Sequence, residues 1–184
     1  MDSRTFFLAL VIGAIIGYSA YGALNPAPCG IPASAYCLNG LAENLISPGA
    51  KQDMLAAINS AEKSIHIILY EFSYSDLKEA LVNARKRGVE VKLILEPKVD
   101  QNLDTADFLK SKGIEVKWAS SKFNNSHAKT AIIDGKRVIT GSLNWSRNAM
   151  ERNREIGAII DNERMAQELE NVFESDWSNG SEVK

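Results

Sequence analysis

Side chains suited to phosphate chemistry gather within one stretch of eighteen residues, from His127 to Asn144. The stretch contains an imidazole (His127), an ammonium group (Lys129), a hydroxyl (Ser142) and a carboxamide (Asn144). Histidine can act near neutral pH as a nucleophile, a base or an acid. Lys129 follows His127 by two residues, so on a strand both side chains point to the same face. The pattern therefore indicates attack on a phosphodiester without a metal ion.

A β-hairpin is the element that would assemble this set. Asp134-Gly135 lies between two apolar runs, 131–133 and 138–139, which is the sequence signal for a tight turn between strands. The returning strand would bring Gly141, Ser142 and Asn144 towards His127, where a small residue admits a ligand and polar groups bind its oxygens. Asp134 is counted among the candidate catalytic residues, but a turn accounts for it better than direct chemistry does.

The phospholipase D superfamily has a signature that this chain resembles, His127-x-Lys129-x4-Asp134-x6-Gly141-Ser142-x-Asn144. The similarity extends from about Ile46 to Trp177. In that superfamily the motif histidine attacks phosphorus and forms a phosphohistidine, and a second copy of the motif supplies a histidine that protonates the leaving oxygen. This chain has one copy of this HKD motif. It therefore resembles the single-motif members, which include small exported bacterial endonucleases and Zucchini-type mitochondrial enzymes.

The resemblance implies a homodimer, because the single-motif members place two copies of the histidine around one phosphate. The only other histidine, His66, has no lysine two residues later and is interpreted as a hydrogen-bonded sheet residue. A two-fold interface between two copies of the chain would supply the second motif histidine. One His127 would attack, and its symmetry mate would act first as general acid and then as the base that activates water.

The remaining site residues follow from the same resemblance. Lys129 and Asn144 would hold the phosphate oxygens and stabilise their growing charge, with help from Ser142. Glu155, in the sequence Asn153-Arg154-Glu155, would bind the other nitrogen of the imidazole and fix its tautomer. Trp145, beside the motif asparagine, is interpreted as a packing residue rather than a base-stacking platform.

The expected fold class is α/β, with a mixed, largely parallel sheet flanked by helices on both faces, as in phospholipase D. Strands and helices alternate along the chain. Expected strands are 65–72, 89–95, 114–118, the hairpin and 155–160, and expected helices start at Ser47-Pro48, Ser75, about Asp104, near Ser146 and after Asn162. One catalytic domain, 43–184, would hold all of them.

The charge of the chain is unevenly distributed. The net charge is −2, but residues 110–154 contain ten basic and three acidic residues, so this region carries +7 and the remainder −9. Such an asymmetry can draw a polyanion to the active-site face. Chance clustering on a solvated surface is the alternative, since no series of aromatic residues interleaves the basic ones.

The amino terminus indicates export. Thr5 to Leu24 is uncharged and long enough to span a bilayer, so residues 1–24 are expected to be a signal anchor or a cleaved signal peptide. Arg4 precedes the apolar run and no lysine or arginine follows it until Lys51, which favours a catalytic domain outside the cytoplasm. A retained anchor is slightly favoured, which would attach the protein to the membrane.

A linker, residues 25–42, follows this segment and contains Cys29 and Cys37. In an exported protein two such cysteines most simply form one disulfide. Free buried thiols and a bridge between two chains are alternatives, and a metal site is disfavoured because no other ligands accompany them.

Three functions from different classes fit these observations. The first is a non-specific endonuclease acting on DNA or RNA, with no metal and no cofactor. The second is a membrane-associated phospholipase D-type lipid hydrolase, and the third is a nucleic-acid or lipid binding module without turnover. The presence of His127, Lys129, Asn144 and Glu155 disfavours the third.

Overall fold

One eight-stranded sheet organises the part of the chain that the computed structural model describes, residues 42–183. Its strand order is β1-β7-β6-β5-β2-β3-β4-β8. The strands are β1 Ala42–Ser47, β2 Ser64–Leu69, β3 Glu90–Leu95, β4 Glu115–Trp118, β5 Lys129–Ile133, β6 Arg137–Gly141, β7 Glu155–Asp161 and β8 Ser181–Glu182.

The sheet is mixed, as expected, but the expectation that it is largely parallel is wrong. Only β2 with β3 and β3 with β4 are parallel; the other five neighbouring pairs are antiparallel. Helical crossovers connect β2, β3 and β4, and such crossovers produce parallel neighbours. The hairpin β5–β6 and the return through β7 have connections without a full crossover, so these strands alternate in direction.

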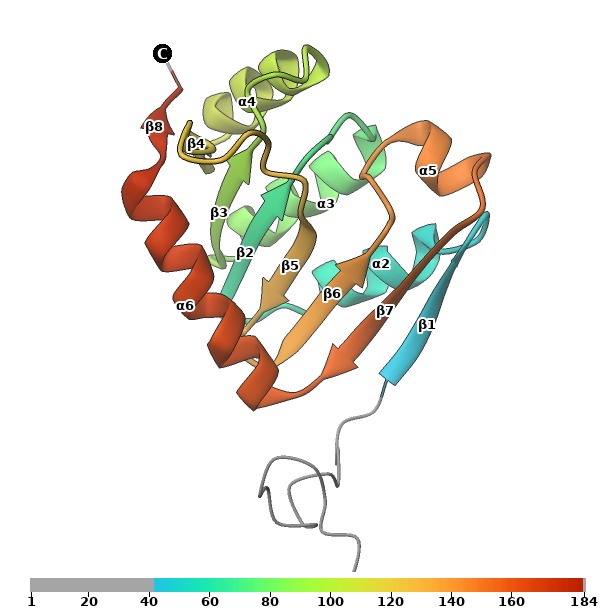
Figure 1. Ribbon diagram of the computed structural model, residues 1–184. Coiled ribbons are helices and arrows are strands. Elements are labelled where there is room, and N and C mark those ends of the chain that lie inside the picture. The colour runs from blue at the N-terminus through green and yellow to red at the C-terminus, as the bar shows by residue number, and fades with distance from the viewer. Residues whose placement is uncertain (1–41, 184) are drawn as a thin grey trace, which may run out of the picture. The chain divides into compact units, whose positions relative to one another are not determined.

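Helices cover both faces of the sheet (Figure 1). On one face, α2 (Lys51–Asn59), α3 (Ser75–Lys86) and α4 (Gln101–Ser111) pack over the larger hydrophobic cluster. On the other, α6 (Glu163–Asn179) packs on β2, β5 and β6 through a smaller cluster that includes Phe173. This two-sided burial explains the continuous apolar run of β2.

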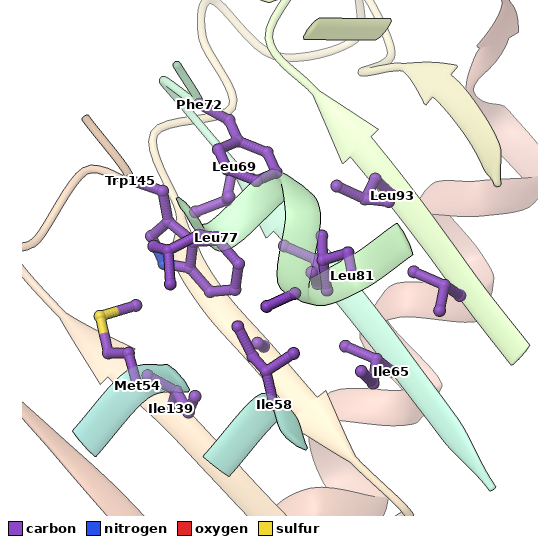
Figure 2. Close-up of a cluster of buried hydrophobic side chains, with 14 of the residues drawn as sticks. Met54, Ile58, Ile65, Leu69, Phe72, Leu77, Leu81, Leu93, Ile139 and Trp145 are labelled. Atoms are coloured by element: carbon purple, nitrogen blue, oxygen red, sulfur yellow. The ribbon is translucent and has the colours of Figure 1, made fainter. Parts of the chain in front are cut away.

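The larger cluster contains the bulkiest buried side chains (Figure 2). Leu77 and Leu81 of α3 belong to this cluster together with Leu69 of β2 and with Phe72, which follows β2. Trp145 packs edge-on against Phe72 with ring centroids 5.2 Å apart. Trp145 is 1% exposed, so the packing interpretation of this residue is confirmed. The cluster therefore supports the strand ends that carry polar side chains.

Helix starts agree with the sequence in part. Asn162 accepts a hydrogen bond from the backbone N–H of Met165 and caps α6, and Ser146 caps the short helix α5 (Arg147–Glu151) in the same way. Ser47 does not start α2 as expected. It lies at the end of β1, a strand that the sequence did not predict, and its hydroxyl donates to the carbonyl of Ala149.

The predicted signal segment 1–24 and the residues Cys29 and Cys37 lie outside the described part of the chain. Within residues 42–183, none of the helices has the length and apolar character needed to cross a bilayer. Export, the disulfide and the domain boundary at residue 43 therefore stay predictions.

Candidate active site

The predicted site lies at one end of the sheet, where the carboxyl ends of β2, β3 and β6 meet the amino ends of β5 and β7. Lys129 is the first residue of β5, His127 lies two residues before it, and Ser142 and Asn144 follow β6. The hairpin is therefore confirmed, with Thr130 opposite Thr140 and Ile133 opposite Arg137. It brings both halves of the motif to the same edge.

His127 and Lys129 are in direct contact. The Lys129 Nζ lies 3.2 Å from His127 Nδ1 and 3.3 Å from Nε2, and it donates to the His127 carbonyl at 2.9 Å. The Tyr70 ring, which follows β2, lies 4.4 Å from the imidazole and 5.0 Å from the Lys129 Nζ, centroid distances in both cases. His127 is exposed, so a substrate can reach the imidazole from solvent.

Lys129 is the buried cation of this site. Only 9% of the surface of Lys129 is exposed to solvent. Burial lowers the pKa of Lys129, while the nearby carboxylates of Glu155 and Glu71 act in the opposite direction. A cation with little access to water interacts strongly with an anion that enters beside it.

Ser142 and Glu155 form a hydrogen-bonded pair across the ends of β6 and β7. The Ser142 hydroxyl donates to Glu155 Oε2 and accepts from the Ile156 backbone N–H at 3.2 Å. Glu155 Oε1 accepts from Asn153 Nδ2 at 3.0 Å. Glu155 thus lies in the site, but its partners within the described residues are Ser142 and Asn153, not His127.

The position of Gly141 requires a glycine because the backbone of β7 lies directly opposite it, and not because a ligand needs room there. A Cβ at this position would lie 2.3 Å from the Gly157 Cα and 2.7 Å from the Ile156 carbonyl oxygen. Any side chain would push β6 and β7 apart at the point where Ser142 meets Glu155. The interpretation of Gly141 as room for a substrate is replaced by this close approach of two strands.

Asn144 is held by a residue that the motif does not contain. Its Nδ2 donates to Glu71 Oε2 at 3.0 Å, while its Oδ1 is buried without a hydrogen-bond partner. Glu71 and its neighbour Tyr70 were not selected as site residues from the sequence. The available signal was their position, because polar residues directly after a buried strand often face a site.

A buried asparagine fixes the backbone on both sides of Glu71. Asn102 of α4 is fully buried; its Nδ2 donates to the Tyr70 carbonyl at 2.8 Å and its Oδ1 accepts from the Phe72 N–H at 2.9 Å. Glu96, also buried, accepts from the Ser126 N–H at 2.7 Å and so anchors the loop before His127. These contacts hold the site residues in place before substrate arrives.

Asp134 does not join the site, which corrects its place among the catalytic candidates. It lies in the turn at the far end of the hairpin, in a left-handed conformation with φ of 54°. Its carboxylate accepts backbone hydrogen bonds from Glu62, Lys63 and Ser64 at 2.7 to 3.2 Å. Burial alone would raise the pKa of Asp134, but these three donors outweigh it and hold the pKa below its usual value.

His66 also lies away from the site. It is a buried strand residue whose Nδ1 contacts Glu170 at 2.6 Å and whose Nε2 contacts Glu90 at 3.0 Å, with its ring stacked on Phe173. Its interpretation as a hydrogen-bonded sheet residue is confirmed. Among residues 42–183 the motif histidine is thus the one histidine at this edge.

The basic residues do not all lie at the site. Lys136 and Arg137 are at the turn end of the hairpin, and Arg137 forms an ion pair with Asp161 at 2.5 Å. Four exposed basic residues do flank the site end, one in the loop before His127 and three in the segment between β6 and β7 that contains α5: Lys122, Arg147, Arg152 and Arg154. In residues 42–183 no group of three or more histidine, cysteine, aspartate or glutamate side chains could hold a metal ion.

Comparison with known proteins agrees with the fold and the motif. Residues 54–177 match the family model described as "Cardiolipin synthase, PLD-like domain", so the chain belongs to this phospholipase D-like family. The mitochondrial cardiolipin hydrolase of Canis lupus familiaris is 31% identical over 159 residues, which cover 86% of this chain and 60% of that protein. The phospholipase D of Rickettsia typhi is 34% identical over 133 residues, 71% of this chain and 65% of that protein.

Solved structures share the architecture. Nuc from Salmonella typhimurium, a phospholipase D family member, has a TM-score of 0.75 at 28% identity and covers 79% of this chain and 99% of its own. NucT from Helicobacter pylori has a TM-score of 0.71 at 24% identity, again over 79% of this chain. The chain thus spans almost the whole of these two structures, but only 60% and 65% of the two curated relatives above.

Proposed function

We propose that this protein is a phosphodiesterase that acts as a metal-independent, non-specific endonuclease on DNA or RNA, through a phosphohistidine at a homodimeric site. The observation that carries the proposal is the contact between an exposed imidazole, His127, and a buried ammonium group, Lys129 Nζ, 3.2 Å away. A nucleophile and a fixed cation can then meet the same phosphoryl group.

The reaction would proceed by two displacements. A nitrogen of His127 attacks phosphorus, the bond from phosphorus to the leaving oxygen breaks, and the partner subunit's His127 donates its proton to that oxygen. Water then attacks the phosphohistidine, the partner imidazole accepts the proton from water, and the phosphorus–nitrogen bond breaks. Lys129 and the amide of Asn144 hold the other phosphate oxygens in both steps.

The surface around the site favours a polyanionic substrate. The exposed basic residues lie in the loop before His127 and in the segment between β6 and β7 that contains α5: Lys122, Arg147, Arg152 and Arg154. Such side chains can bind successive phosphates along a nucleic acid without reading its bases, which fits cleavage with little sequence preference. Their contribution would weaken as salt concentration rises.

A lipid phosphodiester is the second candidate, supported by apolar features beside the site. Phe123, in the loop before His127, is 56% exposed, and a small pocket of about 160 Å³ lies beside His127 with Ile68, Leu169 and Val172 in its lining. An exposed phenylalanine can enter the interface of a bilayer. The names of the two curated relatives, cardiolipin hydrolase and phospholipase D, point the same way.

We further propose that the catalytic domain works outside the cytoplasm, as the apolar segment 5–24 indicates. Digestion of the domain by added protease while the cytoplasmic membrane is intact would support this proposal. Digestion only after the cytoplasmic membrane is broken would contradict it.

A comparison of substrates separates the two candidates. The full-length chain, purified in detergent, is assayed in chelator on single-stranded DNA, duplex DNA, RNA, and vesicles of phosphatidylcholine with or without cardiolipin. We expect cleavage of nucleic acid that His127→Ala abolishes. Cleavage of vesicle lipid alone, lowered by Phe123→Ser, would instead support the lipid hydrolase, and binding without any cleavage would support the third class.

A further inference from the structure

An acidic side chain lies inside the proposed phosphate site without belonging to the motif. Glu71 directly follows the buried strand β2, and Asn102 fixes the backbone on both sides of it through Tyr70 and Phe72. Its side chain is half-buried and its Oε2 accepts a hydrogen bond from Asn144 Nδ2 at 3.0 Å. Glu71 is therefore held in a fixed place next to Asn144, the side chain that the proposed mechanism assigns to phosphate binding.

Glu71 determines which way the Asn144 amide points. The amide has two N–H donors and one carbonyl acceptor, and here the acceptor is buried with no partner. The contact with Glu71 is thus the interaction that orients the group. One N–H is bound to Glu71. In the proposed mechanism the other N–H binds a phosphate oxygen, which would place the carboxylate close to the bound phosphate.

The charge of this carboxylate matters because substrate and product differ in charge. A phosphodiester carries one negative charge at all physiological pH values, whereas a phosphomonoester gains a second above about pH 6. Hydrolysis of a diester turns the first kind of group into the second. Lys129 is the buried cation that attracts either ligand, and Glu71 would repel the extra charge of the monoester.

We propose that Glu71 is a specificity-determining residue, which orients Asn144 for a singly charged phosphodiester and rejects the doubly charged phosphomonoester. The inference rests on the proposed phosphodiesterase function and adds a substrate rule to it. Because of this residue, cleaved monoester ends would not compete with uncleaved substrate. The same role is not assigned to Glu155, because Ser142 and Asn153 bind its two carboxylate oxygens.

Two small ligands that differ by one methyl group test the charge rule: phenyl phosphate and its diester, methyl phenyl phosphate. Their binding to the full-length protein and to Glu71→Gln is measured by calorimetry at about pH 8 and about pH 5, on either side of the second ionisation of the monoester. Glutamine keeps an acceptor for Asn144 Nδ2 and removes the charge. Glu168→Gln, in an exposed ion pair with Arg164 on α6, is the matched control.

We expect Glu71→Gln to bind phenyl phosphate about tenfold more tightly than the natural protein at about pH 8, since one nearby charge is worth on the order of one pKa unit. At about pH 5 the gain should fall to about threefold, because the singly charged monoester feels only half of the repulsion from Glu71. The gain for methyl phenyl phosphate should be about threefold at either pH. Glu168→Gln should show no gain.

Equal gains for both ligands at both pH values would overturn the charge rule and leave only a positioning role. No gain for phenyl phosphate would overturn it as well. Glu71→Ser gives the same comparison if the glutamine variant is unstable. Calorimetry needs no turnover, so these results stand even if the natural protein cleaves none of the substrates above, which would refute the proposed function separately.

Discussion

At the scale of single residues, Lys129 is needed for the proposed chemistry and is expected to lower the stability of the fold. Its ammonium group contacts His127 and is largely removed from water, and burial lowers its pKa. A buried cation costs folding free energy unless a partner compensates it, and here the carboxylates of Glu155 and Glu71 compensate burial only in part, so that the pKa of Lys129 stays lowered. A residue kept for chemistry in this way should be replaceable by an apolar one with a gain in stability.

Lys129→Met should therefore lower cleavage at least about a hundredfold and raise the melting temperature. The activity falls because no fixed cation holds the phosphate oxygens, and the stability rises because methionine is buried without a charge. Thermal unfolding and single-turnover cleavage measure the two effects. Lys136→Met, an exposed position at the other end of the same hairpin, is the control; a lower melting temperature for Lys129→Met would show that its charge stabilises the fold.

At the scale of elements, the two ends of the β5–β6 hairpin have different tasks. One end carries His127 and Lys129, and the other carries the turn, where Asp134 binds three backbone N–H groups at the start of β2. The turn thus fixes the position of β5 beside β2. The motif aspartate supports the hairpin from the end opposite to His127 and Lys129.

Asp134→Ala should lower the free energy of unfolding by about 1 to 3 kcal/mol, because the backbone donors lose a charged acceptor and alanine disfavours the left-handed conformation. Chemical denaturation measures this loss. Cleavage per folded molecule should stay near that of the natural protein at a temperature where the variant is fully folded. A hundredfold loss of cleavage under those conditions would return Asp134 to the catalytic set.

A titratable cluster lies where α6 packs on the sheet. Burial alone would lower the pKa of His66, but its hydrogen bonds with Glu170 of α6 and Glu90 of β3 outweigh burial, and the pKa is raised. Lys92 Nζ also contacts Glu90, at 3.1 Å. The folded state therefore binds the His66 proton more tightly than the unfolded state does.

This raised pKa predicts a pH dependence of stability. The contribution of His66 should be fully present below about pH 6.5, the ordinary value for histidine, and should be lost as pH rises through the folded pKa. Denaturant unfolding across this range should show a decline that His66→Gln lacks and His127→Gln keeps. The same decline in His66→Gln would assign the effect to another group.

At the scale of the whole molecule, the proposed mechanism needs two imidazoles at one site and therefore predicts a second copy of the chain. The described part of each chain supplies one histidine at the site edge, and the proposed mechanism uses one as nucleophile and one as acid. A two-fold dimer supplies both from identical surfaces. Such a dimer would hold one shared site rather than two independent ones.

A subunit-mixing experiment tests this arrangement. Natural and His127→Ala chains are mixed in equal amounts, allowed to exchange, and assayed. A shared site predicts that cleavage falls to about one quarter of that of an all-natural sample with the same total protein, because only about one dimer in four contains two imidazoles. A value near one half would mean that each chain works alone, as would an active monomer in light scattering.

The sequence by itself determined the motif, the hairpin and the roles that follow from residue type. His127 and Lys129 could be paired, and Asp134 assigned to a turn, because strand periodicity and turn chemistry are local properties of the chain. The alternation of helices and strands also followed from local periodicity. The directions of the strands did not, since the sheet is mostly antiparallel.

Only the tertiary structure decided which distant residues complete the site. Glu71 reaches Asn144 across 73 positions of the chain, Asn102 clamps the end of β2 from α4, and Gly141 is small because Gly157 lies opposite it. No local pattern encodes these contacts. They exist because the sheet brings the ends of β2, β6 and β7 to one edge, and pairing between distant strands depends on the packing of the whole domain.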